Sequence, residues 1–249
     1  MSFPEGSKVW SKLVLIGSVI CIFCVLLAIF GVRLGAFNFR VASDMLESTF
    51  QASVAVLAVA IIIFIGEAQT RIKSGAAIVI LLLPLIGIWF NKAPNPVLDE
   101  NGKPSAPLND ISTDTQNPPL YEALVAIRPA GSNSLDYPDN AATLQAERFA
   151  DISSINSLLS ADDAFNKALD LVQQAGWELV YENRETGKIE AVSSTFFFNF
   201  KDDVVIRIQN QDAGSIIDIR SHSRIGKGDQ GKNAERVRDF IATFKQAGI

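Results

Sequence analysis

The sequence predicts an α+β fold on a membrane anchor: three transmembrane helices followed by a soluble two-layer domain, with an antiparallel four-stranded meander and flanking helices. Two observations support this prediction. Three long apolar stretches lie in the first third of the 249-residue chain, and none follows. The last third alternates between segments with a helical period and segments with the two-residue period of strands. Short links between strands imply antiparallel neighbours, and helices packed on such a sheet give two layers.

The anchor is expected to occupy residues 1–92. Its apolar stretches run over residues 13–32, 50–65 and 76–90. About 20 residues of helix cross a bilayer, and a spanning segment must satisfy its own backbone hydrogen bonds, which forces a helix. The alternative for the first stretch is a cleavable signal peptide, but its apolar run is longer than such a peptide needs and no small-x-small cleavage site follows. We therefore expect three uncleaved spans in a lipid bilayer.

The distribution of positive charge predicts the side of the membrane on which the rest of the chain lies. With three spans, the amino terminus and the second loop share one side, and the first loop and the remainder share the other. The basic residues of the two sides are Lys8, Lys12, Arg71 and Lys73 against Arg33, Arg40 and Lys92. Since cytoplasmic loops carry the excess of positive charge, this slight bias predicts an extracytoplasmic domain. The absence of cysteine after the anchor fits an oxidising compartment.

Composition divides the remainder into a linker and a folded domain. Residues 93–119 are rich in Pro, Asn, Asp, Ser and Thr, which predicts an extended lead-in. Residues 120–249 are numerous enough to bury one core and should form the soluble domain. The net charge of the chain is −5, and acidic residues outnumber basic ones after the anchor. This charge argues against binding to nucleic acid.

Periodicity predicts the elements of the soluble domain. A helix begins at Ser160, whose hydroxyl can cap it, and ends at Gly176. The expected strands cover residues 177–181, 188–200, 204–208 and 215–224. The apolar face of a final helix consists of Val237, Phe240, Ile241 and Phe244. In the second strand, Phe196, Phe198 and Phe200 would share one face, which we interpret as sheet packing.

A glycine-rich turn (residues 226–231) between the last strand and the last helix is the best candidate site. Gly226, Gly228 and Gly231 have the GxGxxG spacing of dinucleotide-binding loops, but the preceding strand alternates apolar and charged residues, unlike a buried parallel strand. A phosphate-binding loop lacks the same context, and Asn233 stands where a magnesium-binding Ser or Thr is needed. What remains is a turn that opens a helix, where N–H groups and the helix dipole favour an anion.

Basic side chains surround this turn. They are Arg220, Arg224, Lys227, Lys232, Arg236 and Arg238. We interpret the region as a site for a phosphate, a carboxylate or a lipid headgroup, with Arg224 as a principal contact because a guanidinium can grip an oxyanion with two hydrogen bonds. The alternative is structural: the glycines make the turn, Asp229 caps the helix, and the basic residues pair with nearby carboxylates such as Asp218.

Other residues with reactive side chains give weaker signals. His222 is the only histidine, and its neighbours Ser221 and Ser223 should point to the opposite face of the strand. This geometry disfavours Ser–His chemistry and predicts an exposed strand histidine. The oxygen-rich cluster around Asp110 and Asp114 could hold a hard cation, but turn chemistry explains it as well. With one histidine and two intramembrane cysteines, no zinc-type ligand set is available, so we predict no metal and no cofactor.

Several segments resemble a known family. They are NDISTD with Pro118 and Pro119, GKIEA, KDDVVIRI and the run DIRSHSRIGKGDQGKNAERVRDF. Over about residues 94–244 the chain resembles the family catalogued as domain of unknown function 1499. The resemblance implies a bacterial envelope protein with amino-terminal spans in the inner membrane and a periplasmic domain, and it supplies no mechanism. The motif positions that it marks are Asp110, Ser112, Asp114, Arg220, Ser221, Ser223, Arg224, Gly226, Asp229, Gly231, Asn233 and Arg236.

Three classes of function follow from these patterns. The first is a non-enzymatic envelope protein that binds an anionic ligand, a lipid headgroup or a partner protein around the glycine-rich turn. The candidate binding residues are Arg220, Ser221, Ser223, Arg224, Gly226, Asp229, Gly231, Asn233, Arg236, Asp110 and Asp114. The second is a membrane-anchored hydrolase that uses Asp110, Asp114 and Asp203 beside the turn. The third is a structural subunit of a membrane complex, with the spans as its interface.

Overall fold

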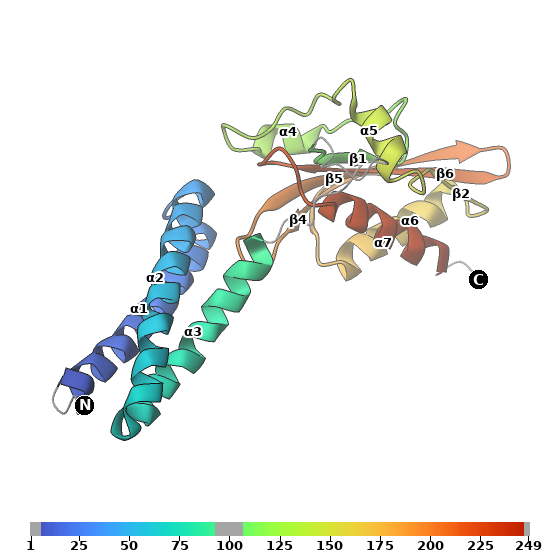
Figure 1. Cartoon of the computed structure of the whole chain (residues 1–249). Coiled ribbons are helices and arrows are strands. Elements are labelled where there is room, and N and C mark those ends of the chain that lie inside the picture. Colours follow the sequence, from blue (N-terminus) through green and yellow to red (C-terminus); the bar gives the residue numbers. More distant parts are fainter. Residues whose placement is uncertain (1–5, 93–106, 247–249) are drawn as a thin grey trace. The chain divides into compact units, whose positions relative to one another are not determined.

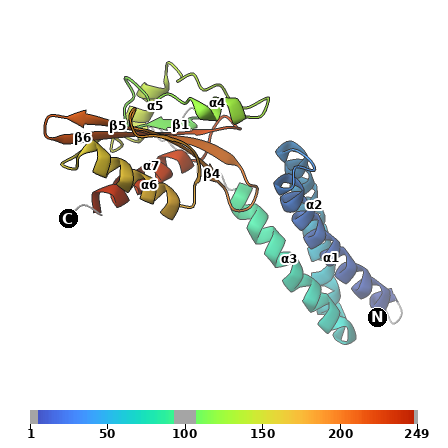
Figure 2. The ribbon, with the colours of Figure 1, turned by 180° about the vertical axis from the view of Figure 1, so that it is seen from behind.

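A computed structural model describes residues 6–92 and 107–246, and the chain divides into two compact units. One unit contains three long apolar helices and the other contains an antiparallel sheet with its helices (Figures 1 and 2). The three helices and the antiparallel sheet with its helices confirm the predicted α+β fold. Residues 93–106, which make up half of the expected linker, lie outside the described part of the chain.

The anchor unit consists of three helices, joined by short connections. These are α1 at Gly6–Arg33, α2 at Phe39–Gly66 and α3 at Arg71–Lys92, with a single 3-10 turn, η1, at Ala68–Thr70. The segments long and apolar enough to cross a bilayer are Lys8–Arg33, Phe39–Gly66 and Ala68–Gly87. Helix α2 begins well ahead of its apolar run because Asn38 caps it, accepting a hydrogen bond from the N–H of Val41 at 3.1 Å.

Small side chains line the contacts between these helices. Fully buried examples are Ser11, Ser18, Ala28, Ala42, Ser53, Ala60, Ser74 and Ala77. Large apolar residues such as Ile62, Ile65 and Ile72 are exposed instead. Lipid is as apolar as leucine, so helices in a membrane gain from close packing between small residues rather than from burying large ones. The anchor unit therefore has the surface of a bundle suited to a bilayer.

Within the described residues the sheet has six strands, in the order β1-β6-β5-β4-β3, and β2 also pairs with β6. Their bounds are Asp110–Ser112 for β1, Ile155–Ser157 for β2, Glu178–Asn183 for β3, Lys188–Ser194 for β4, Lys201–Gln211 for β5 and Gly214–Ser223 for β6. The predicted meander, β3 to β6, is confirmed. Strands β1 and β2 were missed because three residues are too few to show a period. Since β1 pairs with β6, the sheet includes part of the stretch 93–119 that was expected to be a lead-in.

Two long helices form a layer against one face of the sheet. They are α6 at Ala161–Gln174 and α7 at Lys232–Gln246 (Figure 1). Ser160 caps α6 as predicted, because its Oγ accepts a hydrogen bond from the N–H of Asp163 at 3.1 Å. The core between this layer and the sheet contains apolar side chains of β4, β5 and β6 together with Val237, Phe240 and Phe244 of α7.

Short helices cover the remaining surfaces of the sheet. Helix α4, at Ala123–Ile127, packs on the opposite face through a small cluster formed by Tyr121, Leu124, Val192 and Val205. Helix α5, at Ala141–Arg148, lies beside β1. Its Gln145 accepts from the N–H of Ser112 at 3.0 Å and donates to the carbonyl of Ser112 at 2.6 Å. The amide thus closes an edge that would otherwise present unpaired backbone groups.

One strand is shorter than predicted. Strand β4 ends at Ser194, and the phenylalanines at 196–198 form a turn. Thr195 donates from its N–H to the carbonyl of Phe200 and accepts from the N–H of Phe200 at its Oγ1, both at 2.9 Å. Asn199 has a positive φ of 55°, which a continuous strand does not allow. The interpretation of these phenylalanines as one packed face of a strand is therefore wrong.

Candidate functional site

Strand β6 divides the predicted site residues between the two faces of the sheet. Successive residues of a strand point to opposite faces. Ser221 and Ser223 face α7, where both hydroxyls bond to the side chain of Asn233. Arg220 faces α4, where its guanidinium lies over the ring of Tyr121. The residues that the sequence grouped as one site therefore form two polar clusters, an α7-side cluster and an α4-side cluster.

A fully buried ion pair is the centre of the α4-side cluster. Arg220 donates from Nε and Nη2 to the two carboxylate oxygens of Asp110, at 2.9 and 2.7 Å, and neither side chain is exposed. Its guanidinium carbon lies 5.0 and 5.1 Å from the ring centroids of Tyr121 and Tyr137. Burial is the largest single effect and works against the charged guanidinium, but the hydrogen bonds and the negative charge of Asp110 together outweigh it and raise the pKa of Arg220. Burial also raises the pKa of Tyr137 to about 12.

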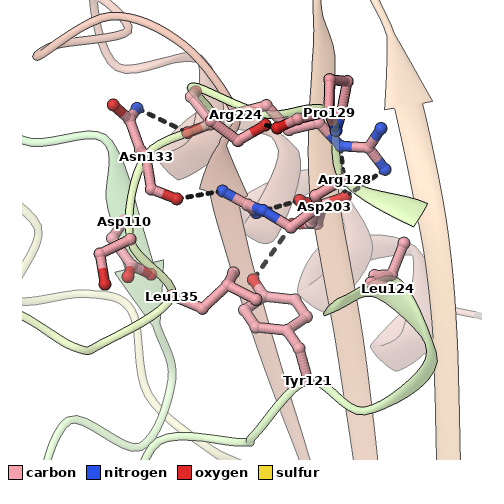
Figure 3. A network of polar contacts seen from close by, with 12 residues as sticks. Asp110, Tyr121, Leu124, Arg128, Pro129, Asn133, Leu135, Asp203 and Arg224 are labelled. Carbon is pink, nitrogen blue, oxygen red and sulfur yellow. Dashed lines mark hydrogen bonds and ion pairs between the residues drawn. The ribbon is translucent and has the colours of Figure 1, made fainter. Parts of the chain in front are cut away.

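A second buried carboxylate in this cluster, Asp203 on β5, is held by two arginines (Figure 3). Arg224 approaches Asp203 Oδ1 from Nε at 2.8 Å and from Nη2 at 2.7 Å, and Arg128 bonds to Oδ2. Tyr121 donates from its hydroxyl to the backbone carbonyl of Asp203 at 3.2 Å. Arg224, the predicted principal contact for an anion, therefore already has a carboxylate partner within the domain.

Hydrogen bonds from two asparagine side chains join the glycine-rich turn to the α4-side cluster. Asn133 donates from Nδ2 to the carbonyls of Ser223 and Gly226, at 2.9 and 2.8 Å. Asn109 donates to the same Gly226 carbonyl at 2.7 Å. The backbone N–H of Asn133 also donates to the carbonyl of Arg224 at 2.7 Å (Figure 3). Two segments distant in sequence thus fix the beginning of the turn. Asn109 opens the NDISTD segment, but no local pattern pointed to Asn133.

Asn233 is the centre of the α7-side cluster. Its side chain accepts from the Ser221 hydroxyl at 2.7 Å and donates to the Ser223 hydroxyl at 2.8 Å. Arg236 donates to the same Asn233 oxygen at 2.6 Å and to Asp202 Oδ2 at 2.8 Å. The polar side chains that the sequence offered as ligands for an anion therefore bind one another, and Asp202 of β5 neutralises the arginine.

The start of α7 is capped by the chain itself. Asp229 accepts from the N–H of Gly231 at 2.9 Å and from the N–H of Asn233 at 2.5 Å, as the structural alternative supposed. Burial raises the pKa of Asp229. Gly226 and Gly231 have φ of 84° and 81°, a conformation that glycine adopts without strain. An external anion at this helix start would have to displace the Asp229 carboxylate.

Asp114 belongs to a third group of charges. Arg207 donates to Asp114 Oδ2 at 2.9 Å and to Asp218 Oδ2 at 2.7 Å. Asp114 also accepts from the N–H groups of Gln116 and Asn117, at 3.1 and 2.9 Å, as in an Asx turn. Of the two aspartates in this oxygen-rich cluster, Asp114 is therefore held by turn chemistry, whereas Asp110 belongs to the buried pair with Arg220. Among the described residues, no group of three or more His, Cys, Asp or Glu is placed to hold a metal ion.

His222 is buried, not exposed as predicted. Only 3% of its surface is exposed, and its register partners on the neighbouring strands are Asp110 and Asp203. Burial lowers the pKa of His222 and so favours the neutral imidazole. In the described part of the chain, Nδ1 of this ring has no hydrogen-bond partner. The hydroxyl of Ser221 lies on the other face of the sheet, in keeping with the expected lack of a Ser–His pair.

Comparison with known families agrees with the resemblance seen in the motifs. The model of the family described as "Protein of unknown function (DUF1499)" matches residues 110–244. This range begins at β1, later than the expected start near residue 94, and it holds both polar clusters and the glycine-rich turn. A search of curated proteins found no match to the chain.

Proposed function

Because the chain belongs to the DUF1499 family and its predicted ligand residues bind one another, we propose that the sheet domain is a non-enzymatic module that binds an envelope protein. Helices α1, α2 and α3 would anchor it in the inner membrane of a bacterium. The binding element is the glycine-rich turn together with the preceding Ile225. The observation that carries the proposal is the set of hydrogen bonds from Asn109, Asn133 and Asp229 that fixes this exposed turn.

The turn is exposed to solvent, and hydrogen bonds from side chains of the domain fix its backbone. Ile225 is 44% exposed, and Lys227 is exposed as well. Asn109 and Asn133 hold the carbonyl of Gly226, and the Asp229 cap holds the other end. Surface loops are usually mobile, so a loop with this support is preorganised, which reduces the entropy lost on binding. An apolar side chain beside a lysine suits a protein partner.

The buried ion pairs argue against a free anion or a lipid headgroup as the ligand. Arg220, Arg224 and Arg236 each bind an aspartate that is fully or almost fully buried. An incoming phosphate or carboxylate would have to break such a pair, and removing one partner of a buried pair costs about 3–5 kcal/mol. The hydrolase alternative meets a similar obstacle, because Asp110 and Asp203 are buried in ion pairs with arginines. The third aspartate of that alternative, Asp114, is partly exposed but is paired with Arg207.

A photo-crosslinking amino acid at position 227 is expected to form an adduct with a protein of discrete mass when the full chain is present in its native membrane. The variant Asn133→Ala removes the side-chain hydrogen bonds from Asn133 to the carbonyls of Ser223 and Gly226, so it should reduce the yield of this adduct several-fold. Immunoblotting and mass spectrometry after irradiation measure both results. The same probe at Asp212, in the exposed turn between β5 and β6, is the matched control and should give no adduct.

Other outcomes of this experiment contradict the proposal in different ways. An adduct with phospholipid alone would favour a headgroup as the ligand. Equal adduct yields from the unaltered chain and from Asn133→Ala would show that the glycine-rich turn, in the conformation fixed by these hydrogen bonds, is not the binding element. Adducts that form only from probes in α1, α2 or α3 would favour a structural subunit whose interface is the anchor.

We also propose that the sheet domain lies in the periplasm. The excess of positive charge at Lys8, Lys12, Arg71 and Lys73 supports this orientation. Alkaline phosphatase fused to the carboxy terminus should be active in cells, and a fluorescent protein that matures only in the cytoplasm should stay dark. Inactive phosphatase together with bright fluorescence would place the domain in the cytoplasm and overturn the orientation.

A further inference from the structure

The turn between β4 and β5 carries an apolar surface that the proposed binding element does not use. Phe196, Phe197 and Phe198 follow one another in this turn, and the first two are 83% and 56% exposed. Hydrogen bonds between Thr195 and Phe200 close the turn at its base, so the aromatic run has a defined shape. Contiguous exposed apolar groups are unfavourable in water and mark surfaces of interaction.

We propose that this phenylalanine turn inserts into the interface of the lipid bilayer that the anchor spans. We expect the turn to contact the bilayer because the chain tethers the sheet domain to it. Helix α3 ends at Lys92 and the sheet domain is described from residue 107, and the residues between them reach at most about 50 Å when fully extended. Phenylalanine is among the side chains that enter the boundary between headgroups and acyl chains.

The sheet register places the phenylalanine turn and the proposed binding element so that insertion of the first is compatible with binding by the second. The proposal that the turn inserts does not depend on the proposed binding function. Asp202 pairs with Ser223, so the phenylalanine turn and the glycine-rich turn lie at the same end of the sheet. Strand β5 runs from Lys201 to Gln211, so Asp212 lies at the other end, about 30 Å away at 3.3 Å per residue. Insertion would bring the glycine-rich turn close to the membrane surface, within reach of a membrane-bound partner.

Spin labelling of the full chain in lipid vesicles tests the insertion. In a background with Cys21→Ser and Cys24→Ser, a nitroxide is attached at Phe196→Cys, and the control label is attached at Asp212→Cys in the opposite turn. The vesicles contain phosphatidylcholine and phosphatidylglycerol. Power saturation should show that the label at position 196 collides several-fold less with a water-soluble nickel chelate than the control label, and more with oxygen, which concentrates in lipid.

Each alternative gives a different pair of accessibilities. Equal collision with the nickel chelate at positions 196 and 212 would show that the turn stays in water. Low collision with both reagents at position 196 would show that the turn is covered by protein, which also overturns the proposal. Adding Phe197→Ser and Phe198→Ser to the chain labelled at position 196 should restore access of the nickel chelate. Unchanged shielding in that variant would contradict insertion by the phenylalanines.

Discussion

Replacing Phe240 with alanine is expected to lower the free energy of unfolding of the sheet domain by about 3–5 kcal/mol. Phe240 is 4% exposed, and its ring centroid lies 6.4 Å from that of Trp177 and 6.0 Å from that of Phe244. Alanine would leave a cavity between α7 and the sheet, and a packed core fills such a cavity only in part. Pulse proteolysis of the full chain in detergent micelles, over a range of urea concentrations, measures the change because the protease cleaves only the unfolded domain.

A matched control separates core packing from the general effect of shortening an apolar side chain. Leu158 belongs to the same domain and is 92% exposed. Leu158→Ala should therefore change the free energy of unfolding by no more than about 0.5 kcal/mol. Identical urea midpoints for Phe240→Ala and the unaltered chain would show that α7 is peripheral to the core.

The elements that sequence analysis predicted correctly are those whose signal is local. Helix α6 has a cap at Ser160 and an apolar stripe along one face, and strands β5 and β6 alternate apolar and polar residues over part of their length. Strands β1 and β2 lack such a signal because they have three residues each and exist through pairing with β6. Their formation depends on contacts between distant segments, which a window of sequence does not contain.

The phenylalanine turn shows a different reason for error. Phe196, Phe198 and Phe200 have the two-residue spacing that is typical of one face of a strand, and aromatic residues favour strands. The end of β4 is set by the hydrogen bonds of Thr195 and by the positive φ of Asn199. Asparagine tolerates this conformation better than most residues, so Asn199 was the one local sign that the strand stops before it.

The sequence analysis named residues that take part in the polar clusters, but it did not predict how these residues are arranged in space. The pattern around the glycine-rich turn grouped Arg220, Ser221 and Arg224 as candidate binding residues, although the period of a strand places Ser221 on the opposite face from the two arginines. Their carboxylate partners were not predictable from spacing, because Asp110 and Asp203 come from other strands of the sheet. A cluster of basic residues in sequence was therefore not a basic surface in space.

Replacing Asp110 with asparagine is expected to lower the free energy of unfolding of the sheet domain by about 3–5 kcal/mol, because it leaves a buried charge without its partner. Both side chains of the pair with Arg220 are fully buried, and two hydrogen bonds join them at 2.9 and 2.7 Å. Asparagine keeps the shape of the side chain but removes the negative charge. The guanidinium would retain its contacts with the carbonyls of Pro119 and Leu135, which do not neutralise it. Urea-dependent pulse proteolysis again measures the loss.

An exposed pair of the same chemistry provides the control. Asp151 accepts two hydrogen bonds from Arg238 at 2.5 Å, but the side chains are 57% and 41% exposed. Asp151→Asn should therefore cost no more than about 1 kcal/mol, since water screens and replaces the interaction. A second variant, Asp110→Leu with Arg220→Met, removes both charges and should recover much of the stability lost with Asp110→Asn, because an apolar pair has no charge to desolvate. If Asp110→Asn costs no more than Asp151→Asn, water reaches Arg220, and the anion site that the buried pair argues against becomes the better explanation of this arginine.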